Sequence, residues 1–318
     1  MNKKRFQNIV AESRFSLTIT AVACGLVWAA ACFLNHALLP SLAMMVVATY
    51  LMVEINNSNS LIRIYSRMVS CAFLALSTMT IGNFTAWQTT LVMLCLAVFY
   101  RITFSCYQDK AAVGRIFHAF LAIGLASCVF AKMLFLLPVL WIIVAVNLQA
   151  MTLRNFCASL LGLITPYWLV AGYFLYQADY TTPLNHFTEL TRFALPATID
   201  ISQHLHPLVT FAFIVVLTFT GIIHFLRQRS KDKLRTQIIY ELFLIVTLFT
   251  IVFLVLQPQH NDFLLRILII HASIFIGHFI ALTRTKVTNI AFIVIFILTL
   301  AITAFHFIFS SKFDGFSH

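Results

Sequence analysis

Residues 238–256 read IIYELFLIVTLFTIVFLVL, and this stretch decides the class of fold. Glu241 is its one charged residue, and nearly all of the others are aliphatic or aromatic. A helix of about 20 apolar residues is long enough to cross the hydrocarbon core of a bilayer, because each residue adds about 1.5 Å. We therefore predict a membrane-spanning helix here.

Stretches of similar length and hydropathy recur along the whole chain. By the same criterion the predicted spans lie near residues 15–34, 37–53, 66–82, 87–106, 116–131, 133–149, 156–176, 208–226, 238–256, 265–283 and 287–310. The fifth and sixth are short and separated only by Lys132, so a re-entrant pair or two tilted half-helices are alternatives there. The sequence predicts an all-α, polytopic transmembrane bundle of about eleven spans.

The composition leaves no room for a soluble domain. Hydrophobic residues make up 61% of the 318 residues and charged residues 10%, whereas a typical soluble domain has about 25% charged residues. The longest polar segment is residues 177–207, which is too short to fold alone. We therefore predict a single transmembrane domain over residues 1–318.

The charges predict an orientation. The net charge is +11, but the cations stand in short runs between apolar stretches, and this placement argues against a nucleic-acid partner. With the N-terminus in the cytoplasm, 17 of the 21 Lys and Arg residues fall on the cytoplasmic side. The positive-inside rule then predicts an N-terminus inside and a C-terminus outside. The four outer cations are Lys132, Arg192, Arg266 and Lys312.

The segment 177–207 is the largest predicted outer, or periplasmic, loop. Its Phe187, Leu190, Phe193 and Leu195 recur at nearly helical spacing. Such a pattern is typical of an amphipathic helix that lies in the membrane interface. We predict an interfacial helix in this loop.

Familiar catalytic and cofactor motifs are absent. The chain has no GxxxxGK[ST], HExxH, GxSxG or GxGxxG. His271 and His278 are seven residues apart and share a helix face, but no second helix offers a matching pair, so polar bonds between helices are the simpler interpretation. The seven cysteines form no CxxC pair and read as packing residues. We predict no cofactor and no metal site.

The outer cations are the candidate binding residues, because they oppose the orientation rule. Lys132 stands at a helix junction and Arg266 opens a span, so each could hold an anionic headgroup or a lipid-linked phosphate through charge-assisted hydrogen bonds. Arg192, in the outer loop, is a third candidate. The alternative is that these side chains reach toward the interface or pair with Asp262 or Glu189.

Two blocks of sequence resemble a known family. Residues 124–138 read GLASCVFAKMLFLLP, Trp141 follows, and residues 162–167 read GLITPY. These blocks resemble an uncharacterised multi-spanning inner-membrane family of Bacteroidota, in which a GLAS block and a tryptophan precede a GLLTPY block at similar spacing. The resemblance covers roughly residues 50–180 and implies a multi-pass protein of a bacterial inner membrane.

The same region has a weaker resemblance to the C-type (GT-C) membrane glycosyltransferases. In those enzymes a GLA…TK…LLLP run precedes an RYLLPLLP-like span. Lys132 matches the lysine, and Arg266, in RILIIH, matches the arginine. The resemblance implies a sugar linked to polyprenyl phosphate and a catalytic acid in the first outer loop. That loop, near Asn35, has no acid here, so Glu189 or Asp179 would have to supply it.

Three functions therefore stand as hypotheses. The first is a GT-C-like inner-membrane protein that handles a lipid-linked sugar or another anionic lipid at the outer leaflet, with or without catalysis. The second is a non-catalytic membrane subunit or assembly factor that contacts envelope proteins through its loops. The third is a transporter, which repeats and paired broken helices would favour; neither is evident in the sequence.

Orientation yields the first testable prediction. Reporter fusions placed after Arg235 and after His318 should report the cytoplasm and the periplasm, respectively, because the charge bias places these positions on opposite sides of the membrane. A cytoplasmic signal at His318 would remove one span from the predicted topology.

Overall fold

The computed structural model describes residues 5–81, 86–192 and 205–313, and every regular element within these ranges is helical. The chain divides into two compact units, each of which is described by itself. Unit 1 comprises Met1–Thr90, Ile199–Thr236 and Leu268–His318, and unit 2 comprises Leu91–Thr198 and Gln237–Ile267. The prediction of an all-α fold is confirmed for the described residues, and the single transmembrane domain stays a prediction.

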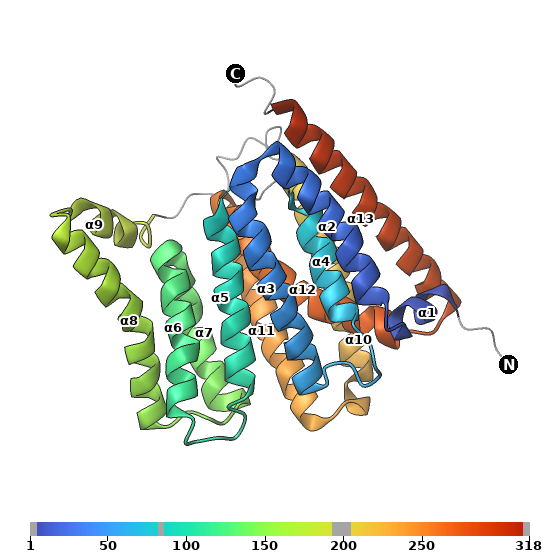
Figure 1. The fold of residues 1–318 in the computed structure, drawn as a ribbon. Helices are drawn as coiled ribbons and strands as arrows, with labels where there is room; N and C mark the ends of the chain where they lie inside the picture. The colour runs from blue at the N-terminus through green and yellow to red at the C-terminus, as the bar shows by residue number, and fades with distance from the viewer. Residues whose placement is uncertain (1–4, 82–85, 193–204, 314–318) are drawn as a thin grey trace. The chain divides into compact units, whose positions relative to one another are not determined.

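Figure 1 labels the helices in chain order. Those of unit 1 are α1 (Phe6–Glu12), α2 (Ser16–Leu34), η1 (His36–Leu38), α3 (Leu39–Asn59), α4 (Met68–Met79), α10 (Leu205–Gln228), η6 (Arg229–Lys231) and α13 (Lys286–Phe313). Those of unit 2 are α6 (Val113–Val129), η3 (Ala131–Leu136), α7 (Leu137–Ile142), η4 (Ile143–Asn147), α8 (Leu153–Tyr176), α9 (Thr181–Thr188) and η7 (Pro258–His260). Three helices contribute residues to both units: α5 (Trp87–Phe104), α11 (Leu234–Leu256) and α12 (Asn261–Leu282).

The described residues contain eight helices that are long and apolar enough to cross a membrane. They are Ser16–Leu34, His36–Asn59, Trp87–Phe104, Leu153–Tyr176, Leu208–Lys231, Leu234–Leu256, Pro258–Leu282 and Lys286–His306. Three shorter apolar helices, Met68–Met79, Val113–Val129 and Ala131–Asn147, coincide with the remaining predicted segments. The protein is therefore a multi-pass helical membrane protein, whereas eleven crossings and their orientation stay predictions.

The helix Ala131–Asn147 is irregular, and its sequence explains why. It begins as the 3₁₀ helix η3, continues as the short α-helix α7, and ends as the π-helix η4. Pro138 lies in the first turn of α7, where its missing N–H has no helical partner to lose. The irregular start places Lys132 at the junction that the sequence indicated.

Unit 1 is organised around α4, against which α2, α3 and α13 pack. The sequence of α4, MVSCAFLALSTM, alternates small residues with large ones, and nearly all of them are buried. Small residues allow membrane helices to approach closely. Trp28 of α2 adds a polar link, because its Nε1 donates to Thr78 Oγ1 over 3.2 Å.

The closest helix contact in unit 2 joins α6 and α8, which run side by side (Figure 1). A Cβ atom on Gly162 would lie 2.3 Å from the carbonyl oxygen of Phe117, and one on Gly124 would lie 2.5 Å from that of Leu163. Both glycines belong to the blocks that carry the family resemblance. Those blocks therefore encode the packing of α6 on α8.

The glycine contact gives a stability prediction. Gly162→Ala should lower the free energy of unfolding by about 1–3 kcal/mol, because the new methyl group meets main-chain atoms that cannot move aside easily. Gly172→Ala in the same helix is the control, since no atom lies within 4 Å of the Cβ it adds. Thermal unfolding of the detergent-solubilised chain measures both, and an equal change in the two variants would contradict the packing argument.

Candidate functional site

Lys132 lies in unit 2 as a buried cation with 2% of its surface exposed. Its Nζ donates to the side-chain Oε1 of Gln257 over 2.7 Å and to the main-chain oxygen of Arg192 over 2.9 Å. Gln257 stands between α11 and η7, and Arg192 follows α9. One lysine thus joins the loop after α8, which the charge pattern predicts to be an outer loop, to the turn that begins α12.

Two further charged or titratable groups surround this lysine. Glu189, at the end of α9, interacts electrostatically with both Lys132 and His260. The ring of Phe130 stacks on Phe263 with centroids 4.5 Å apart and contacts the His260 ring at 5.3 Å. Phe130 also lines the same small cavity as Lys132, so an aromatic group lies beside the polar cluster.

Arg266 is equally buried, with 2% of its surface exposed. Its electrostatic partner is Asp262, which stands four residues earlier in α12 and so lies on the same face of the helix. This supports the alternative given in the sequence analysis, that Arg266 pairs with Asp262. Arg266 and the neighbours of Lys132 belong to the same unit; a common role for the two cations stays a prediction.

The cavity beside Lys132 is small. It has a volume of about 10 Å³ and is walled mainly by apolar residues, among them Phe249, Leu264 and Ile267. This volume is about that of one water molecule. Arg266 does not line it, so this cavity is not shared by the two cations.

The remaining predicted site residues lie in or beside α9. Arg192 is exposed and contributes its main-chain oxygen, rather than its guanidinium, to Lys132. Glu189 is exposed. Phe193 and Leu195 of the predicted interfacial helix lie outside the described residues. Of the four residues that carry the prediction, α9 contains Phe187 alone, so the interfacial helix stays a prediction.

Contacts with α6 and α8 hold α9 in place. His186 lies 2.9 Å from the main-chain oxygen of Ser127, and the Phe187 ring stacks on Tyr167 at 5.6 Å. The Tyr167 hydroxyl donates to Ser127 Oγ over 2.9 Å. The sequence alone did not identify His186, Ser127 and Tyr167 as hydrogen-bonding groups. Ser127 and Tyr167 nevertheless lie in the two blocks of sequence, residues 124–138 and 162–167, that carry the resemblance.

Asp179 caps the first turn of α9. Its carboxylate accepts hydrogen bonds from the main-chain N–H groups and the hydroxyls of Thr181 and Thr182 over 2.6–3.2 Å. These bonds, the Thr182 hydroxyl foremost, lower the pKa of Asp179 to about 2. A general base works best with a pKa near the working pH. The geometry therefore suits a helix cap rather than the catalytic base proposed from the sequence.

A second polar cluster lies in unit 1, where a chain of side chains links α10 and α12. Asp232 lies 3.3 Å from His278 Nε2, and His278 Nδ1 lies 3.2 Å from His224 Nδ1. Arg63 approaches Asp232 from the other side at 3.7 Å. The interpretation of His278 as a polar bond between helices is confirmed. Asp232 was missed, although it is the one acid among the cations of residues 227–235.

Comparisons with protein-family models, with curated proteins and with solved structures found no match to this chain. The interpretation of both clusters therefore depends on their geometry.

The Asp179 cap gives a prediction about pH. Because the pKa of the folded group is depressed, the carboxylate stabilises α9 above the ordinary carboxyl pKa of about 3.9 and loses this effect as the pH falls through about 2. Hydrogen–deuterium exchange should find α9 equally protected at pH 7 and pH 5. Asp179→Ala should speed exchange in residues 181–188, and Asp179→Asn, which keeps a capping oxygen, should do so less. Equal exchange in all three proteins would contradict the cap.

Proposed function

We propose that this protein binds an anionic lipid, such as a sugar linked to polyprenyl phosphate, at the outer leaflet of a bacterial inner membrane. Lys132 and Arg266 are the residues proposed to hold the phosphate, as the resemblance to GT-C enzymes implies. The observation that carries the proposal is that both cations are almost fully buried within one unit of a membrane protein. Placing such a cation at mid-bilayer costs roughly 2.5–3.5 kcal/mol on insertion scales, and ionisable groups kept there are functional candidates by default.

The hydrogen bonds of Lys132 suggest how a phosphate would enter. Gln257 and the Arg192 main chain offer neutral oxygens. An anionic phosphate oxygen forms a stronger, charge-assisted hydrogen bond to an ammonium group. Exchange of the Arg192 oxygen for phosphate would release the segment after α9 and enlarge the small cavity.

Glu189 is the candidate catalytic base of this proposal. It is exposed, and it lies within electrostatic range of Lys132. An acceptor hydroxyl held beside the phosphate would lose its proton to this carboxylate. Asp179 is a weaker candidate, because its oxygens already accept the capping bonds.

A non-catalytic membrane subunit or assembly factor is the second candidate function. The observation that favours it is that each cation has an acid of its own in the chain, Glu189 for Lys132 and Asp262 for Arg266. The cluster then serves to hold the outer loop on α12. Envelope proteins would bind to that loop.

Lipid binding separates the two functions. The full chain in phosphatidylcholine nanodiscs should bind polyprenyl phosphate, and Lys132→Met should weaken this binding by about 10–100-fold, because it removes a hydrogen bond between charged groups. Lys110→Met is the control, since Lys110 is an exposed lysine of the same unit outside the cluster. Native mass spectrometry measures retention of the lipid. If the unmodified chain retains no more polyprenyl phosphate than Lys132→Met does, the non-catalytic function replaces the first.

A further inference from the structure

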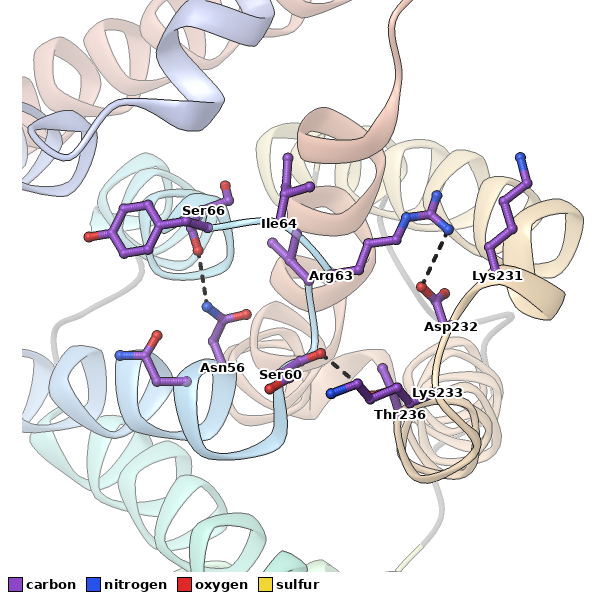
Figure 2. A pocket seen from close by; sticks show the side chains of 12 residues that line it. Asn56, Ser60, Arg63, Ile64, Ser66, Lys231, Asp232, Lys233 and Thr236 are labelled. Carbon is purple, nitrogen blue, oxygen red and sulfur yellow. Dashed lines mark hydrogen bonds and ion pairs between the residues drawn. The ribbon is translucent and has the colours of Figure 1, made fainter.

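A polar pocket in unit 1 includes Arg63 and Asp232 of the second cluster but none of the residues on which the proposed function rests. Its volume is about 540 Å³, within the range typical of small-molecule sites. One wall is the end of α3 with the loop that follows it, and the other is the connection from α10 to α11 (Figure 2). Both walls stand where membrane spans end, on the face that the charge pattern predicts to be cytoplasmic.

The asparagine-rich end of α3 explains the first wall. Ser60 closes the helix with a left-handed backbone (φ 50°), and Leu61 N–H returns to the Asn56 main-chain oxygen over 3.2 Å. The turn directs the chain along the pocket toward Ser66. Asn56 Nδ2 donates to the Ser66 main-chain oxygen over 3.1 Å, and this bond determines which side-chain atom of Asn56 is the oxygen.

The second wall and Arg63 make the pocket electropositive. Lys231, Asp232 and Lys233 follow one another along this wall, and Arg63 reaches Asp232 from the facing loop (Figure 2). Three cations and one acid line the pocket, a net charge of +2. Both lysines are exposed, so their ammonium groups are accessible to a ligand.

Asp232 holds this wall in place, and its negative charge does little to repel an anionic ligand. Only 2% of its side chain is exposed, and it lies between Arg63 at 3.7 Å and His278 at 3.3 Å. The charge of the carboxylate is thus largely balanced by Arg63. The charges of Lys231 and Lys233 remain for a ligand.

Asn56 indicates that the ligand also carries a hydrogen-bond donor. It is 6% exposed and lines the pocket, and its Oδ1 has no hydrogen-bond partner among the described residues. A buried carbonyl oxygen without a donor is unfavourable, because it has given up its hydrogen bonds to water and gained none in return. Figure 2 shows this oxygen turned toward the middle of the pocket. A ligand hydroxyl could bind there after a small shift of the side chain.

We propose that this pocket binds a phosphate monoester that carries a neighbouring hydroxyl group. Such a monoester has a charge near −2 at pH 7, which matches the +2 of the pocket, and basic pockets between spans on the cytoplasmic side suit anionic headgroups. A divalent cation fits poorly, because the lining is net positive and the described residues hold no group of three His, Cys, Asp or Glu. The monoester is either a lipid headgroup or a soluble phosphorylated polyol.

The test uses the full chain in phosphatidylcholine nanodiscs and two probes. Glycerol 3-phosphate in solution represents the soluble source, and lysophosphatidic acid in the nanodisc, whose glycerol keeps a free hydroxyl beside the phosphate, represents the lipid source. Calorimetry and native mass spectrometry measure the two, respectively. Retention of lysophosphatidic acid alone assigns a headgroup, and binding of glycerol 3-phosphate assigns a soluble ligand. Binding of neither probe overturns the proposal.

Paired variants locate the binding. Lys231→Gln with Lys233→Gln should weaken it by about 30-fold, since each cation near a membrane surface contributes roughly a factor of five. Arg227→Gln with Arg229→Gln is the matched control: it removes the same charge from the same connection, but neither residue lines the pocket. Equal weakening by both pairs would mean general surface attraction and would overturn the site.

A variant that should bind more tightly is also needed, because a variant that fails to fold can only lose affinity. Asp232→Asn removes the one negative charge of the lining and releases Arg63 toward the ligand, so it should tighten phosphate binding severalfold. Asn56→Leu should weaken glycerol 3-phosphate more than it weakens inorganic phosphate, which lacks the carbon-bound hydroxyl. Two results together would exclude the pocket as the binding site: unchanged phosphate affinity in Asp232→Asn, and equal weakening of glycerol 3-phosphate and inorganic phosphate binding by Asn56→Leu.

Discussion

Inside a bilayer every peptide group must find its hydrogen-bond partner within the protein, because lipid offers none. This constraint explains why every regular element of the described residues is a helix. It also determines where irregular backbone can occur. Ser60 turns the chain at the end of α3, and the segment η3–η4 changes helix type where Lys132 and Pro138 stand. Both candidate sites lie beside such departures from a regular helix.

Charge within this apolar framework is compensated in two different ways. In unit 2, Lys132 has an aromatic group beside it and is bonded to neutral oxygens, so an anion would have to displace protein groups. In unit 1, Lys231 and Lys233 are exposed, and the charge of Asp232 is balanced by Arg63. An anion could therefore bind the two lysines without displacing a protein group. The first cluster reads as a closed site or a structural tie, and the second as an open pocket.

The two blocks of sequence, residues 124–138 and 162–167, have a packing role that involves no ligand. Gly124 and Gly162 permit close approach of α6 and α8, and Tyr167 bonds to Ser127 across this contact. Trp141 Nε1 donates to Ser159 Oγ over 3.1 Å in the same unit. Residues that pack helices in this way are shared by proteins of similar architecture whatever they bind. The blocks are therefore stronger evidence for a fold than for a reaction.

The sequence by itself determined the helical class, the position of each apolar segment, and the choice of Lys132 and Arg266 as unusual cations. These properties depend on the hydropathy and charge of residues that are near one another in the chain, so they can be read locally. Tertiary structure decided which groups meet these cations. Gln257 is 125 positions from Lys132, and Asp232 is 46 positions from His278. Such pairs arise from how helices pack, and hydropathy cannot encode them, because lipid-facing and protein-facing apolar residues look alike in sequence.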